Sequence, residues 1–292
     1  MTFHMDLKEL KALWRTQKFR PDKRLGQNFL VDNNVRDKIL KELPLSGEKA
    51  VLEIGPGFGV MSFELASRCG RLIAVEKDPK ICRMMEPVFA GEPRIELLNS
   101  DILQVDICAL SKKGEEKIVV YGNVPYYIST PIIEKMISEK SCIDSLYLVI
   151  QEEFADRIVA SPGKKAYGSL SCFIQYHAYP KKLFRIKKNS FLPRPKVDSC
   201  LIRFVLPDSP TVKVSNEDLM FRIIRGAFSQ RRKKMINPLS SGDLKGISRD
   251  EWKNIFETCG IDPSSRAENL SLADYARLSD IAEQYYGNKG LF

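Results

Sequence analysis

The chain has 292 residues, of which 43% are hydrophobic, and its 46 Lys and Arg against 37 Asp and Glu give a formal net charge of +9. A chain of this length can bury roughly 75% of its unfolded surface, in one large or two smaller domains. No apolar run approaches the ~18 to 20 residues of a membrane span, and the N-terminus lacks the pattern of a secretory signal, so we expect a cytoplasmic protein.

The first two thirds of the chain alternate between short apolar strands and helical segments. The predicted strands cover residues 51–54, 71–76, 95–98, 117–121 and 145–150, and the predicted helices cover 33–43, 60–68 and 151–159. Nearly all-apolar strands separated by helices indicate a mostly parallel sheet covered on both faces. We therefore predict a Rossmann-like, doubly wound α/β domain, which strands at 171–179 and 197–205 close as an antiparallel pair.

The turn-rich stretch Pro207–Pro210 ends this pattern, and only helices are predicted after it. Residues 216–235 are periodic, Ser248–Glu251 has the form of a capping box, and Ser271–Asp274 resembles another cap. The sequence therefore predicts two domains, an α/β domain at residues 1–207 with a basic N-terminal leader and a small helical domain at residues 208–292.

A glycine-rich turn, Gly55-Pro56-Gly57-Phe58-Gly59, follows the first predicted strand. Glu76 ends the second strand, where a carboxylate can bind the two hydroxyls of a ribose. Asp101 follows the third strand and can accept a hydrogen bond from an adenine amine. The Gly-x-Gly-x-Gly spacing and the second acid favour S-adenosylmethionine over a dinucleotide, but a nicotinamide-dependent oxidoreductase stays open on this loop alone.

The fourth strand leads into Asn123-Val124-Pro125-Tyr126. An Asn side-chain oxygen and the next backbone carbonyl can accept both N–H bonds of an exocyclic amine and localise its lone pair, while the Tyr ring offers a stacking surface. An ordinary strand-end turn is the alternative. Because the carboxyl ends of parallel strands share one edge, Asn123 is expected beside Gly55, Glu76 and Asp101.

Positive charge is concentrated between residues 181 and 240, where 15 Lys and Arg face 4 Asp and Glu, a local charge of +11. Three basic runs lie in this segment: Lys181-Lys182, Lys187-Lys188 and Arg231-Arg232-Lys233-Lys234. Any one run is commonly a solvated helix face, but three together indicate a nucleic-acid partner.

The seven cysteines are scattered without a Cys-x-x-Cys pair. This spacing argues against both a disulfide framework and a zinc site. We expect the cysteines to be small buried hydrophobic residues and expect no metal.

Four stretches, in the same order as in the family, resemble the ribosomal RNA adenine N6,N6-dimethyltransferases. They are Arg24–Leu30, Glu53–Gly59, Asn123–Thr130 and Phe191–Ser199. The resemblance implies cofactor contacts from Asn28, Leu30, Gly55, Gly57, Glu76, Asp101 and Asn123. It also implies that Asn123, Tyr126 and Phe191 hold the target base and that Arg231, Arg232, Lys233 and Lys234 contact rRNA phosphates. Tyr127 stands where many relatives have Asn, and Val124 where Leu or Ile is usual.

Two stretches of the helical segment, Phe228–Lys234 and Gly260–Leu270, resemble the KsgA type of this superfamily more than the erythromycin-resistance (Erm) type. The resemblance implies dimethylation, from S-adenosylmethionine, of two adjacent adenosines in the 3′-terminal hairpin loop of 16S rRNA in the small ribosomal subunit, a step of ribosome biogenesis. The enzyme is expected to act as a monomer. An Erm-type enzyme acting on 23S rRNA and a non-catalytic RNA-binding assembly factor stay as alternatives.

Overall fold

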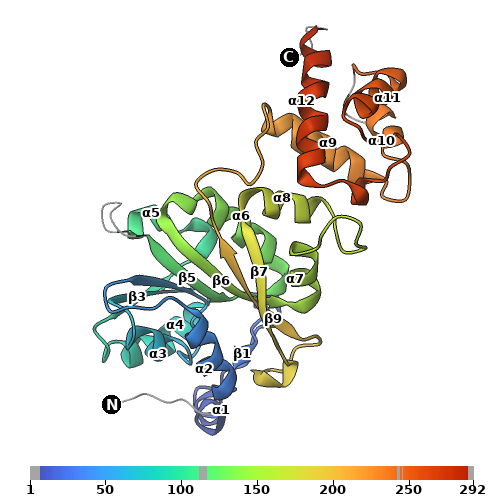
Figure 1. Ribbon diagram of the computed structural model, residues 1–292. Helices are drawn as coiled ribbons and strands as arrows, with labels where there is room; N and C mark the ends of the chain where they lie inside the picture. Colours follow the sequence, from blue (N-terminus) through green and yellow to red (C-terminus); the bar gives the residue numbers. More distant parts are fainter. Residues whose placement is uncertain (1–6, 112–116, 242–243, 245, 289–292) are drawn as a thin grey trace. The chain divides into compact units, whose positions relative to one another are not determined.

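The computed structural model describes residues 7–111, 117–241, 244 and 246–288, without the side chains of residues 7–9, 23, 126 and 286–288 (Figure 1). The chain divides into two compact units. The first comprises the described residues up to Ala155 together with Lys181–Asp208, and the second comprises Asp156–Pro180 and the described residues from Ser209 onward. No helix in the described part of the chain has the length and hydrophobicity that crossing a membrane requires.

The first unit is built on a seven-stranded sheet of order β4-β3-β2-β5-β6-β9-β7. Its strands are β2 (Ala50–Ile54), β3 (Arg71–Glu76), β4 (Ile95–Asn99), β5 (Ile118–Asn123), β6 (Ile143–Gln151), β7 (Tyr179–Ile186) and β9 (Ser199–Val205). The five strands β2 to β6 run parallel, and β9 pairs antiparallel with β6. The predicted Rossmann-like α/β fold is confirmed, including the antiparallel strand near its end.

Helices cover the sheet because its strands are apolar on both faces. The helices of this unit are α1 (Leu7–Thr16), α2 (Asn33–Glu42), α3 (Ser62–Ala66), α4 (Pro79–Phe89), α5 (Ile107–Leu110) and α6 (Ser129–Ser138); α7 (Glu152–Ile158) crosses into the second unit. One face of the sheet, with Val51, Leu72 and Val119, packs against α2 and α3. Asp32 and Asp78 cap α2 and α4 through their side chains, which explains where these helices begin.

A short antiparallel pair, β1 (Phe29–Leu30) with β8 (Phe191–Leu192), ties the N-terminal leader to the segment before β9. Leu30 is paired with Phe191, and both side chains are buried. The leader is thus held in place over the body of the first unit.

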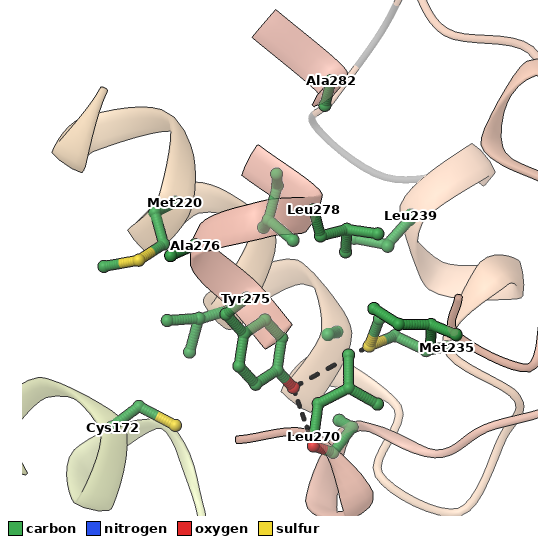
Figure 2. Packing of buried hydrophobic residues seen from close by; sticks show 14 of the residues in the cluster. Cys172, Met220, Met235, Leu239, Leu270, Tyr275, Ala276, Leu278 and Ala282 are labelled. Atoms are coloured by element: carbon green, nitrogen blue, oxygen red, sulfur yellow. Dashed lines mark hydrogen bonds between the residues drawn. The ribbon is translucent and has the colours of Figure 1, made fainter. Parts of the chain in front are cut away.

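The second unit is helical, with α8 (Ser169–His177), α9 (Glu217–Ser229), α10 (Ile236–Ser241), α11 (Arg249–Thr258) and α12 (Leu272–Asn288). Figure 2 shows part of its core around Tyr275, whose hydroxyl donates to the Ala267 carbonyl at 2.7 Å. The two predicted caps are confirmed, since Ser248 and Glu251 form a capping box and Ser271 exchanges hydrogen bonds with Asp274. These caps satisfy N–H groups that a helix start leaves unpaired.

The prediction of a strand at residues 171–179 is wrong, because Ser169–His177 forms α8. Cys172 and Tyr176, one turn apart, are buried in the same cluster as residues of α9 and α12. These contacts outweigh the strand propensity of a short apolar run. The same packing assigns residues 156–180 to the helical unit, whereas the sequence suggested a single boundary at 207/208.

The expectation for the cysteines is also wrong at one pair, since Cys108 in α5 and Cys142 form a disulfide. Cys69, Cys82, Cys172 and Cys200 are buried and unpaired, as expected for small hydrophobic residues. The Cys108 sulfur also lies near Asp106 and Glu139, the only potential metal-ligand cluster among the described residues. A disulfide sulfur is not a thiolate ligand, so this group does not make a metal site as it stands.

Candidate active site

A pocket with an empty volume of about 990 Å³, its open mouth included, lies at the carboxyl ends of the parallel strands. This is the edge at which ligands bind in doubly wound sheets, and the volume falls within the range of ligand sites. All seven residues predicted to contact the cofactor line it: Asn28, Leu30, Gly55, Gly57, Glu76, Asp101 and Asn123. The fold therefore brings together groups from the leader and four strand ends that lie almost a hundred residues apart.

At its first two glycines, the turn after β2 places bare backbone against this pocket. Gly55 and Gly57 have φ values of 70° and 55°, in the left-handed region that glycine adopts without steric cost. A Cβ added at Gly55 would meet nothing nearer than the Asn123 carbonyl oxygen, at 3.9 Å, whereas one added at Gly57 would lie 2.7 Å from the Phe29 ring. The turn is thus open to a ligand at Gly55 and closely packed at Gly57.

Glu76, at the end of β3, holds this turn in place. Its carboxylate accepts hydrogen bonds from the backbone N–H of Gly57 at 3.2 Å and of Asp78 at 2.8 Å. Burial raises the pKa of Glu76 above its ordinary value, and the two backbone donors oppose that shift. A carboxylate that also lines the pocket can accept hydrogen bonds from the hydroxyls of a ribose.

Asp101 follows β4 and forms an ion pair with Lys77 at 2.6 Å, while it also accepts from the Leu103 N–H at 3.1 Å. Burial raises the pKa of Asp101, but the bonds from Lys77 and Leu103 outweigh it, so the pKa lies below its ordinary value. The side chain is therefore an ionised acceptor at the pocket wall. Sequence reasoning missed Lys77, although its position next to Glu76 at a strand end was a usable signal.

Asn123 is the last residue of β5, and its side-chain nitrogen donates to the Asn28 carbonyl at 2.9 Å. This bond orients the amide and joins the strand end to the leader, so that the Oδ1 atom is left as the acceptor. Pro125, Tyr127 and Ile128 also line the pocket. The Tyr126 side chain lies outside the described part of the structure, and its backbone begins the 3-10 turn Tyr126–Ile128.

Two pocket residues were not singled out by the base-binding prediction. Tyr127 lines the pocket with 59% of its surface exposed, and Tyr121 lines it from β5. Phe191, which was predicted to stack on the base, is 4% exposed and does not line the pocket. It packs in the cluster that contains Leu30 and Ile186, so its contact with a base stays a prediction.

Glu53 lies behind the glycine turn and is almost completely buried. It accepts a hydrogen bond from the Ser62 hydroxyl at 2.6 Å, and burial raises its pKa to about 7. The nearby Glu76 carboxylate acts in the same direction. A buried acid with this pKa carries its proton over part of the neutral range.

In the second unit, the basic run after α9 is not uniform. Arg231 forms an ion pair with Glu268 at 2.9 Å and donates to the carbonyls of Lys165 and Tyr167. Arg232, Lys233 and Lys234 are exposed. The Arg231 guanidinium therefore joins two segments of its own unit, whereas the other three side chains face solvent.

The sequence matches the family model described as ribosomal RNA adenine dimethylase over residues 18–284. It is 38% identical over 278 residues to ribosomal RNA small subunit methyltransferase A of Alkaliphilus oremlandii, covering 94% of this chain and 96% of that protein. A dimethyladenosine transferase from Plasmodium falciparum superposes with a TM-score of 0.70 at 23% identity, covering 90% of this chain and 98% of that one. The 23S rRNA methyltransferase ErmE superposes with a TM-score of 0.67 at 23% identity, covering 88% and 100%. The two structures show a shared fold alone.

Proposed function

Because the chain belongs to the ribosomal RNA adenine dimethylase family, we propose that it methylates N6 of two adjacent adenosines in the 3′-terminal hairpin loop of 16S rRNA, within the small ribosomal subunit. The product at each position is N6,N6-dimethyladenosine, and the methyl donor is S-adenosylmethionine. The observation that carries the proposal is the position of Asn123, which lines the same pocket as Gly55, Glu76 and Asp101.

The residues of the pocket fit S-adenosylmethionine, which when bound supplies an electrophilic methyl group on its sulfur. The buried carboxylate of Glu76 is suited to the ribose hydroxyls, and the ionised Asp101 to the amine of the adenine ring. The open space at Gly55 admits the rest of the molecule against the backbone, beside Asn28, Leu30 and Gly57. None of these contacts requires a metal.

The target adenine is held by acceptors at the end of β5. An adenine amine is a weak nucleophile because its lone pair is delocalised into the ring. The Asn123 Oδ1 atom and the Val124 carbonyl accept its two N–H bonds and localise that pair toward the pocket. Aromatic side chains stack on the base and fix its orientation, a role we give to Tyr126 and Phe191. Positioning of this kind is the main requirement of a group transfer with a reactive donor.

The rest of the substrate is held by charge. Arg232, Lys233 and Lys234 are exposed and supply sequence-independent contacts to rRNA phosphates. We give Arg231 a structural role instead, because its guanidinium is already bonded to Glu268 and two carbonyls. The small subunit is preferred over a 23S substrate because the curated relative carries the name of a small-subunit enzyme at 38% identity. We further propose that the enzyme works as a monomer in the cytoplasm.

The test is methyl transfer from labelled S-adenosylmethionine to small subunits from a strain that lacks the modification, with large subunits in parallel and mass spectrometry of the nucleosides. We expect dimethyladenosine in 16S rRNA alone. Label in 23S rRNA would favour the Erm-type activity, and cofactor binding without transfer to either would favour an assembly factor. Asn123→Ala should abolish transfer and leave RNA binding nearly unchanged.

A further inference from the structure

One face of α1 and the turn after it carries four exposed basic side chains, Lys11, Arg15, Lys18 and Arg20, which we call the α1 surface. Lys11 and Arg15 are four residues apart in α1 and so lie on one side of the helix, and Lys18 and Arg20 follow after its end at Thr16. The four residues line a shallow depression together with Trp14 and Phe19. None of the four forms an ion pair within the described part of the chain.

The local charge is strongly positive. Residues 7–24 contain seven Lys and Arg and two Asp and Glu, a sum of +5. One of those acids, Asp22, is paired with Arg24 at 2.9 Å and does not neutralise the α1 surface. A dense group of long basic side chains that form no ion pair among the described residues, beside an aromatic side chain, is suited to a nucleic-acid backbone.

The adjoining face of α1 packs against residues of the cofactor pocket. Leu10 is buried, and Trp14 packs against Phe29 and Phe58 with ring centroids 5.6 and 5.9 Å apart. Phe29 and Phe58 both line the pocket, one from the leader and one from the glycine turn. A polyanion bound to the α1 surface is thus held on the same packed body as the cofactor site.

The backbone at Lys18 gives a further indication. Lys18 has a φ of 49°, in the left-handed region that ends many helices and that glycine occupies at no steric cost. The N–H of the following residue, Phe19, bonds to the Trp14 carbonyl at 2.9 Å and closes the helix end. A lysine at this position retains a positive charge at the expense of local stability.

We propose that the α1 surface binds the phosphate backbone of the rRNA substrate, as an RNA contact separate from the one that we give to Arg232, Lys233 and Lys234. This inference rests on the proposed function for the identity of the RNA. The contact requires no particular base, since the four side chains that carry it are all cationic. It supplies affinity and helps to hold the substrate in register with the pocket.

The test compares Lys11→Gln/Arg15→Gln and Lys18→Gly with wild-type protein, using the full chain. Lys41→Gln is the matched control, because Lys41 is an exposed lysine of α2 outside the α1 surface. Binding to protein-free 16S rRNA and to unmethylated small subunits is measured between about 50 and 200 mM salt. Each lost phosphate contact should weaken binding roughly 5- to 8-fold at 0.1 M salt and reduce the salt slope by about 0.7 to 0.9.

Lys18→Gly separates binding from folding, because it removes the charge and also relieves the backbone. We expect its melting temperature to equal or exceed that of wild type while its RNA affinity falls. Unchanged affinity of both variants for protein-free rRNA would overturn the inference, as would an equal loss in Lys41→Gln. A loss seen with subunits but not with protein-free rRNA would point to a ribosomal protein and would also overturn it.

The two proposals fail in different ways. If wild type methylates small subunits and the α1 variants bind rRNA normally, only the α1 surface is refuted. If wild type transfers no methyl group, the proposed function fails, whereas the direct binding measurements on the α1 surface still decide its role.

Discussion

The two glycines of the turn after β2 should respond differently to the same substitution. Both have positive φ, so an alanine at either costs about 1 to 2 kcal/mol of backbone strain. At Gly55 the new methyl group enters open space, 3.9 Å from the nearest atom, and nothing is added to that cost. At Gly57 it lies 2.7 Å from Phe29, and overpacking of this kind typically costs about 1 to 3 kcal/mol more. Gly57→Ala should therefore be the more destabilised protein.

Cofactor binding should reverse the order. The open space at Gly55 is the part of the pocket that we give to the ligand. Gly55→Ala should therefore lower the affinity for S-adenosylmethionine at least tenfold, although it destabilises the protein less than Gly57→Ala does. Urea unfolding followed by Trp14 fluorescence measures the first unit, in a background where Trp252, the other tryptophan, is replaced by Phe. Titration calorimetry measures binding. Equal destabilisation by the two alanines, or wild-type binding by Gly55→Ala, would refute this account of the turn.

Three further outcomes are expected. Because the pKa of Glu53 is raised to about 7, the folded state holds a proton that the unfolded state releases near pH 4.5. The free energy of unfolding of wild type should therefore fall by on the order of 3 kcal/mol from pH 4.5 to 7, relative to that of Glu53→Gln. Urea unfolding across that pH range measures the difference. Arg231→Gln should lower the free energy of unfolding, followed by Trp252 fluorescence, by about 1 to 3 kcal/mol, because it leaves a carboxylate and two carbonyls without their donor. The control Lys233→Gln should change the same free energy by less than about 0.5 kcal/mol. The disulfide joins Cys108 to Cys142 across a sequence separation of 34 residues, so reduction should destabilise wild type by about 2 to 4 kcal/mol. Reductant should not change the stability of Cys108→Ser. An equal effect of reductant on both proteins would contradict the pairing.

Much of the first unit could be predicted because its signals are local. Short apolar runs such as Val51–Ile54 are buried on both faces, and each ends where a turn or polar residue follows. The caps at Ser248 and Ser271 were readable for the same reason, since a cap depends on residues three positions apart. Helix ends were less accurate: the periodic stretch 216–235 contains the end of α9 at Ser229. A tight turn at a helix end leaves little trace in hydrophobic periodicity.

The sequence by itself determined the fold class, the positions of the parallel strands along the chain and the set of groups at their carboxyl ends, because parallel topology brings Gly55, Glu76, Asp101 and Asn123 to one edge whatever the details of packing. Only the tertiary structure decided which of the predicted side chains are buried or already paired with another residue. In the sequence Arg231 looks like one more basic residue, whereas the structure shows its guanidinium bonded to Glu268, 37 residues away. The burial of Phe191 beside Leu30 is likewise visible only in the structure, and its contact with a base stays a prediction. The same holds for α8, whose helix depends on partners that lie beyond residue 209, and for the disulfide. Burial and pairing depend on which distant segments meet, and local patterns carry little information about such contacts.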